Sequence, residues 1–384
     1  MGGKQLENLS IYIHVPFCKK KCYYCDFSSY SGKENLIKEY IIALKEEIIL
    51  YAEEIEKYNI QTIFFGGGTP SVLKSSQIEE IMDCIKENYN ISKTAEISIE
   101  LNPESMDIDK LKTYYNTGIN RLSIGLQACQ DHLLKKLGRL HNYEDYLKNL
   151  KCARDVGFTN ISTDLMFALP GQKIEDLYET LENIINLEIP HISTYSLIIE
   201  EGTLFYQWEK SGNISRLTED LELRMYHDAI KYLKSKNYTH YEISNFAKPG
   251  FQSKHNKIYW QNLNYIGLGS GAHSYFKDQR FNNFVDIETY IHHINLNKKP
   301  IENIIDISRK DEISETMFLG LRMMEGISID KFQKRFNESP FDIYEKQFLD
   351  LKKKGLLSWD EKHIYLTKKG IDLANIVFQE MLLD

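Results

Sequence analysis

Three cysteines stand close together near the start of the chain, in the segment CKKKCYYC that runs from Cys18 through Cys22 to Cys25. Thiolates are soft ligands that suit iron–sulfur clusters, and a tight loop can place three of them on three corners of one [4Fe–4S] cube. The remaining iron is then open to the amino and carboxylate groups of a small molecule. A tetrahedral zinc site is an alternative, but it needs a fourth protein ligand, for which His14 is a candidate.

The other cysteines, the charge and the hydropathy of the chain indicate the kind of protein that holds this cysteine cluster. Cys84, Cys129 and Cys152 are scattered and are expected to behave as small buried hydrophobes. The first ten residues lack the apolar stretch of a secretory signal, and clustered thiols in such a chain favour metal or redox chemistry over disulfides. With 47 basic and 55 acidic residues the net charge is −8, which argues against nucleic-acid binding. No apolar run reaches the ~18 residues that span a bilayer. A cytoplasmic protein without an integral membrane segment is expected.

The elements that must position the cysteines form a repeating pattern. Six short runs rich in Ile, Leu, Phe or Tyr alternate with helical stretches, namely Ser10–Val15, Thr62–Phe65, Glu96–Leu101, Arg121–Leu126, Ile161–Leu169 and Ile192–Ile199. Alternating strands and helices predict a parallel α/β sheet, and six units are too few for a closed eight-stranded barrel. We therefore expect a partial, open six-unit βα barrel with its site at the carboxyl ends of the strands.

The pattern changes in the last part of the chain. Helical segments follow from Arg309, then a possible hairpin formed by Gly355–Trp359 and His363–Thr367, then a final helix over Lys368–Leu383. Helices with a hairpin predict a small winged-helix-like domain over residues 301–384, after a barrel with a carboxyl-terminal extension over residues 1–300. Packing or protein contact is the expected role of this small domain.

Polar residues end or interrupt the predicted strands. Gly66-Gly67-Gly68-Thr69-Pro70 closes the second strand, and glycines there allow a ligand close access to backbone N–H groups. Glu100, Gln127 and Asp164 occupy the next strands, where a buried charge is unfavourable unless it is paired or faces a ligand. An ion pair between Asp164 and Arg139 or Arg121 is the alternative to the ligand role.

The motif C-x3-C-x-aromatic-C, with Tyr24 as the aromatic residue, resembles the signature of the radical S-adenosylmethionine (SAM) superfamily. Over nearly the whole chain the sequence is similar to the oxygen-independent coproporphyrinogen III oxidase family. This resemblance implies that Cys18, Cys22 and Cys25 hold a [4Fe–4S] cluster beside bound SAM. It also implies that the remaining cofactor contacts are made by Tyr12, Tyr24, Gly67, Gly68, Thr69, Glu100, Gln127, Arg139 and Asp164.

Two features separate branches of that family. The porphyrinogen-decarboxylating branch carries a further cysteine two residues after the third one, where this chain has Phe27. The string His255-Asn256-Lys257-Ile258-Tyr259-Trp260 resembles the H-N-x-x-Y-W motif of the HemW family of haem chaperones. The resemblance implies haem as cargo, haem-accepting proteins and an electron donor as partners, and His255 as haem ligand, with His273 as its rival. Oxidative decarboxylation of coproporphyrinogen III is the alternative function, and the sequence leaves open whether SAM is cleaved.

Overall fold

The structure is a computed structural model that describes residues 6–383. Its centre is a curved sheet in which six parallel strands lie side by side in chain order. They are β1 (Glu7–Val15), β2 (Tyr58–Gly67), β3 (Ile91–Leu101), β4 (Arg121–Gln127), β5 (Ile161–Phe167) and β6 (His191–Ser196). Each overlaps a strand predicted from the sequence, although β5 and β6 end at Phe167 and Ser196, before the predicted ends at Leu169 and Ile199. The sheet does not close within the described residues, so the predicted open βα barrel is confirmed.

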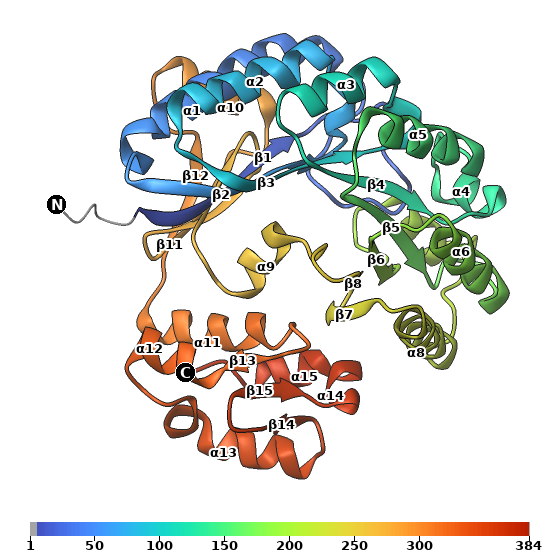
Figure 1. Cartoon of the computed structure of the whole chain (residues 1–384), viewed down its shortest axis with the longest axis vertical. Coiled ribbons are helices and arrows are strands. Elements are labelled where there is room, and N and C mark those ends of the chain that lie inside the picture. The colour runs from blue at the N-terminus through green and yellow to red at the C-terminus, as the bar shows by residue number, and fades with distance from the viewer. Residues whose placement is uncertain (1–5, 384) are drawn as a thin grey trace.

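Helices cover the convex face of this sheet (Figure 1). They are α1 (Ile37–Ile55), α2 (Ser75–Asn88), α3 (Ile108–Asn116), α4 (Asp131–Leu137), α5 (Tyr143–Val156), α6 (Ile174–Asn186) and α8 (Glu219–Ser235). In α1, Ile41, Leu44 and Ile48 recur at helical spacing and are buried against the strands. Each such side chain contributes roughly 1.5–3 kcal/mol on burial. This shared core fixes where the strand ends lie.

Strands that follow the six units extend the sheet at both edges. β7 (Thr239–Glu242) and β8 (Asn245–Ala247) continue beyond β6, whereas β9 (Tyr265–Leu268), β10 (His273–Phe276), β11 (Gln279–Asn283) and β12 (Ile301–Asp306) continue beyond β1. The connecting helices are α7 (Leu204–Lys210), α9 (Lys254–Trp260) and α10 (Ile287–Asn295). Helix α9 lies on the concave side of the sheet (Figure 1). Because β12 pairs with β11, residues 301–306 belong to the large sheet and not to the small domain where the predicted boundary would put them.

The carboxyl-terminal region has a hydrophobic core of its own. Its helices are α11 (Arg309–Gly320), α12 (Ile329–Phe336), α13 (Pro340–Lys353), α14 (Lys368–Asp372) and α15 (Ala374–Gln379), and its strands are β13 (Ile327–Ser328), β14 (Leu357–Trp359) and β15 (His363–Leu366). The predicted hairpin is present as antiparallel β14 and β15. The single final helix predicted from the sequence is wrong, since the chain leaves helical geometry at Leu373 between α14 and α15. No helix in residues 6–383 is both long and apolar enough to cross a membrane.

Candidate cluster and cofactor site

A pocket of about 380 Å³ opens at the carboxyl ends of the parallel strands. Eleven of the thirteen residues predicted to hold a cluster or cofactor line it, namely Cys18, Cys22, Tyr24, Cys25, Gly67, Gly68, Thr69, Glu100, Gln127, Arg139 and Asp164. These residues come from segments far apart in the sequence. They meet because parallel strands bring their carboxyl ends to one edge of the sheet.

The cysteine loop leaves β1 after Val15 and is tied down at both ends. The N–H of Cys18 donates to the Tyr30 carbonyl over 2.9 Å, and the N–H of Tyr30 donates to the Pro16 carbonyl over 2.7 Å. On its other side, the N–H of Thr69 donates to the Phe17 carbonyl over 2.9 Å, which binds the loop to the glycine-rich segment. The position of the first thiol is therefore set by the protein backbone.

The three thiols suit a cluster better than a single ion. All three line the same pocket, yet within the described residues no three His, Cys, Asp or Glu side chains are close enough together to hold one metal ion. A zinc site requires such convergence. Burial raises the pKa of Cys18 and raises that of Cys25 to about 11, so thiolates are stable here only with a cationic partner such as iron.

Side-chain hydrogen-bond donors reach the sulfurs of Cys18 and Cys22. The Thr69 hydroxyl donates to Cys18 Sγ over 3.5 Å, and Arg139 Nη1 donates to Cys22 Sγ over 3.5 Å. The Nε of Arg139 is buried and has no partner among the described residues. Donors to the ligating sulfurs and a buried cation both favour a negatively charged cluster, so the residues present fit the group that the motif implies.

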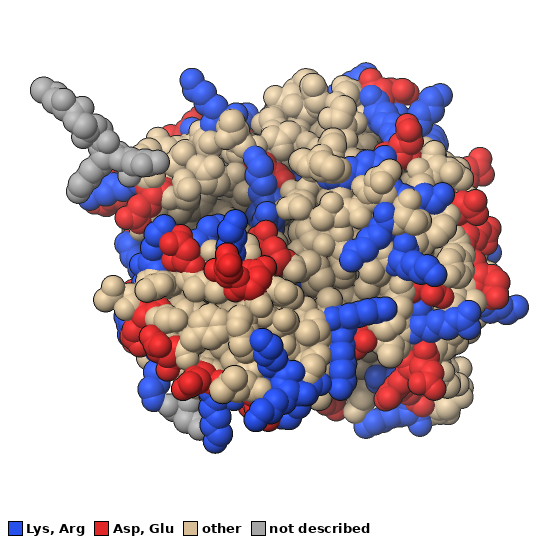
Figure 2. All heavy atoms as spheres, turned by 60° about the horizontal axis from the view of Figure 1, so that its bottom comes forward, with Lys and Arg blue, Asp and Glu red and all other residues tan. Residues whose placement is uncertain are grey.

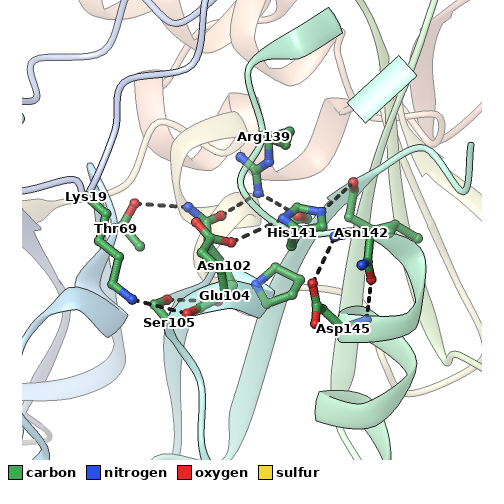
Figure 3. Close-up of polar contacts among 12 residues, drawn as sticks. Lys19, Thr69, Asn102, Glu104, Ser105, Arg139, His141, Asn142 and Asp145 are labelled. Carbon is green, nitrogen blue, oxygen red and sulfur yellow. Dashed lines mark hydrogen bonds and ion pairs between the residues drawn. The ribbon is translucent and has the colours of Figure 1, made fainter. Parts of the chain in front are cut away.

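Asn102 joins these two donors, and nothing in the sequence pointed to it. Its Oδ1 accepts from Arg139 Nη2 over 2.6 Å, and its Nδ2 donates to the Thr69 hydroxyl over 3.0 Å (Figure 3). The same Arg139 nitrogen also donates to the Gly125 carbonyl over 2.7 Å. A continuous chain of hydrogen bonds therefore runs from Cys18 through Thr69, Asn102 and Arg139 to Cys22.

Two carboxylates stand on the strand side of the pocket. Burial and the neighbouring Asp164 raise the pKa of Glu100 to about 8. Burial also raises the pKa of Asp164, whose oxygens accept from the Ser123 hydroxyl at 3.2 and 3.1 Å. No ion pair forms between Asp164 and Arg139 or Arg121 in the described structure, so the ion-pair alternative is wrong. A cationic ligand that fills the pocket would stabilise both carboxylates in their charged form.

Backbone strain marks a further residue of the pocket. Gln127 ends β4 at a register shift, and its φ of 75° lies in the left-handed region that non-glycine residues rarely adopt. Its side-chain carbonyl accepts a hydrogen bond from the Tyr195 hydroxyl over 3.2 Å. Strain of this kind persists where the surrounding structure enforces it, and it is common at binding sites.

The structure places the other two predicted residues outside this pocket. Tyr12 lines an adjoining pocket, and its hydroxyl lies 3.0 Å from His14 Nδ1. His255 is only 1% exposed on α9, with Nδ1 2.7 Å from the Thr62 hydroxyl and Nε2 2.8 Å from the Tyr259 hydroxyl. Burial lowers its pKa to about 3, so the ring is neutral. Because both ring nitrogens are engaged, this geometry favours a structural role for His255 over ligation of haem.

An open βα barrel with three loop thiols at its strand ends defines a radical SAM fold. The sequence matches the radical SAM superfamily over residues 12–184 and the HemN C-terminal domain over residues 307–373. The solved structure of coproporphyrinogen III oxidase (HemN) from Escherichia coli, a radical SAM enzyme, superposes with a TM-score of 0.86 at 25% identity. That match covers 98% of this chain and 90% of the other.

Curated relatives narrow the assignment. Heme chaperone HemW of Bacillus subtilis is 38% identical, with 97% of this chain and 99% of the relative covered. Heme chaperone HemW of Lactococcus lactis is also 38% identical, with 98% and 97% covered. The chain therefore belongs to the HemW family within the radical SAM superfamily. Membership implies a [4Fe–4S] cluster and SAM as cofactors.

Proposed function

We propose that this chain is a haem chaperone, which binds haem and delivers it to haem-accepting proteins, with the cluster and SAM as ligands that control its state. The observation that carries the proposal is the full-length similarity, at 38% identity, to curated haem chaperones. An electron donor for the cluster and action in the cytoplasm belong to the same proposal. On the face shown in Figure 2, basic and acidic side chains are interspersed, which offers protein partners charges of both signs.

The residues of the pocket have separate tasks in this proposal. When bound, the cluster can supply one electron to the sulfonium group of SAM. Glu100 and Asp164 would counter the positive charge of SAM, and Arg139, which donates to Cys22 Sγ, would face the negative charge of the cluster. Asn102 holds Arg139 and Thr69 in place, so the donors to the two sulfurs act as one unit.

Oxidative decarboxylation of coproporphyrinogen III is the second candidate, and the TM-score of 0.86 to HemN is the observation that favours it. Phe27 argues against it, since it stands where the decarboxylating branch has a further cysteine. Anaerobically reconstituted protein should bind haem and pass it to the apo form of a b-type haem protein. With SAM, a reductant and coproporphyrinogen III it should form no protoporphyrinogen. Turnover at enzyme-like rates would overturn the chaperone assignment.

A further inference from the structure

A second pocket, of about 460 Å³, adjoins the cofactor pocket on the strand side. The two share Asp26, Phe27, Gly67 and Glu100 in their linings. The volume lies within the range of roughly 300–1,000 Å³ that is typical of sites for small molecules. The three cysteines and most of the implied SAM contacts line the first pocket, so the part of the second pocket formed by Tyr259, Tyr265 and His273 is left without an assigned ligand.

Four Phe or Tyr side chains line the second pocket beside the carboxylates of Asp26 and Glu100. Phe27 is 62% exposed, an unusual state for a large apolar side chain beside a cavity. Tyr259 and Tyr265 line the pocket with their rings packed edge to face, at a centroid distance of 4.7 Å and an interplanar angle of 87°. Aromatic rings that line a pocket can each stack on a flat ligand.

One histidine in this pocket has its ring nitrogens free. His273 begins β10 with an exposed side chain, and neither ring nitrogen has a hydrogen bond within residues 6–383. His14 lines the same pocket, but its Nδ1 lies 3.0 Å from the Tyr12 hydroxyl and its Nε2 2.8 Å from the Ser28 carbonyl. A neutral imidazole with an available nitrogen is a competent ligand for haem iron.

The backbone that precedes His273 is held firmly. Glu47, fully buried on α1, accepts from the N–H of Gly269 over 2.7 Å, from Asn283 Nδ2 over 2.7 Å and from the Tyr290 hydroxyl over 2.6 Å. The Asn283 amide also donates to the Gly269 carbonyl over 2.9 Å. His273 therefore projects from a fixed support, which lowers the entropy lost when a ligand binds.

We propose that this second pocket is the haem site, with His273 as the axial ligand and with Phe27 and Tyr259 as walls of the porphyrin site. This inference rests on the proposed chaperone function and names the site where the cargo is held. His255 then acts as a positioning residue, because its Nε2 fixes the Tyr259 hydroxyl while Thr62 holds its other nitrogen. In this proposal His255, the histidine of the family motif, positions the Tyr259 wall of the pocket, and His273, which lies outside the motif, binds the haem iron.

The shared lining has a thermodynamic consequence. Haem in the second pocket lies beside SAM in the first, separated by Phe27 and Glu100, which line both pockets. Ligands that share side chains change one another's affinity, and the change is reciprocal. Bound SAM should therefore alter the affinity for haem, and bound haem should alter the affinity for SAM by the same factor.

The test uses full-length, cluster-reconstituted protein with ferric haem, followed by electron paramagnetic resonance, in which the oxidised cluster is silent. Wild type should give a haem signal with imidazole ligation. His273→Ala should lose that signal and bind haem roughly 10-fold more weakly or worse, because even outer partners of metal ligands contribute about 10–100-fold to affinity. Added free imidazole should restore the signal. Metal-free protoporphyrin IX, which makes no axial bond, should bind His273→Ala as it binds wild type.

Two control variants separate the outcomes. His132 on α4 is another exposed histidine with no hydrogen bond in the described chain, and His132→Ala should match wild type. His255→Gln should keep the imidazole signal. Unchanged haem affinity and an unchanged signal in His273→Ala would overturn the assignment of this pocket as the haem site. Loss of the imidazole signal in His255→Gln instead would identify His255 as the haem ligand and leave the chaperone function in place. Failure of wild type to bind haem would overturn both. SAM affinity, measured by calorimetry without haem, verifies that each variant is folded.

Discussion

Substitution of Gly68 by alanine should remove the cluster from a chain that still folds. A Cβ at this position would lie 2.8 Å from the Phe17 carbonyl oxygen and 2.9 Å from Cys18 Sγ. Ordinary contact begins near 3.4 Å, so the Phe17–Cys18 backbone must move by about 0.6 Å. Metal–ligand distances tolerate only about 0.2 Å. Overpacking of this size costs about 1–3 kcal/mol of folding stability.

The assay is iron and sulfide content, with the iron–sulfur absorbance, after anaerobic reconstitution, beside thermal unfolding of the cluster-free protein. Gly118→Ala is the matched control, because Gly118 has φ of 92° with nothing within 4 Å of a new Cβ. Its cost is conformational, about 1–2 kcal/mol. Both variants should lose similar stability, and only Gly68→Ala should lose iron. Full iron content in Gly68→Ala, or equal loss of iron in the control, would refute the steric argument.

Three further predictions follow from the charges and hydrogen bonds of the site. Asn102→Ala should lower the reduction potential of the cluster in a redox titration. Asn102 supports the donors to Cys18 and Cys22, and hydrogen bonds to the cluster sulfurs raise the potential. An unchanged potential would show that Asn102 is dispensable. The affinity for SAM should fall by up to about tenfold per pH unit below pH 8, because the pKa of Glu100 is about 8 and only its ionised form complements the cation; calorimetry of Glu100→Gln should show a flatter profile. Burial raises the pKa of Glu47 to about 7 from an ordinary value of 4.5, so the folded state keeps a proton that the unfolded chain loses. Stability is thus fully present below pH 4.5 and should fall by about 3 kcal/mol as the pH rises to 7, which chemical denaturation of wild type and Glu47→Gln would measure.

The six strands could be predicted from the sequence because each is an apolar run with a polar or glycine end, and the strand order follows from their alternation with helices. The same rule predicted that strand-end residues such as Glu100 and Asp164 share one pocket, because the carboxyl ends of parallel strands meet at one edge of the sheet. Asn102 could not be found in this way, since Asn-Pro after a strand is typical of an ordinary turn. Its role depends on Arg139 and Thr69, which reach it from other segments.

His255 illustrates the opposite limit. His255, close to Tyr259 and Trp260 in the sequence, matches a motif. That motif is local in sequence, whereas the hydrogen bonds and burial of the His255 ring depend on residues from distant parts of the chain. Thr62, almost two hundred residues earlier in the chain, occupies one nitrogen, and the fold buries the ring against Phe64 at a centroid distance of 5.1 Å. His273 carried no such motif, and only the pairing of β10 with β11 and β9 shows that it faces the second pocket.

The backbone ties of the cysteine loop determine the order in which the protein is assembled. The N–H of Cys18 donates to the Tyr30 carbonyl and the N–H of Tyr30 donates to the Pro16 carbonyl. The conformational entropy of this part of the loop, about 1–2 kcal/mol for each residue fixed, is therefore lost during folding and not during metal insertion. Small zinc domains behave in the opposite way, because they fold only when the metal arrives. A cluster-delivery protein therefore meets a loop whose first thiol, Cys18, is already positioned by the backbone. Damage to the cluster by oxygen leaves a folded apoprotein that can be loaded again.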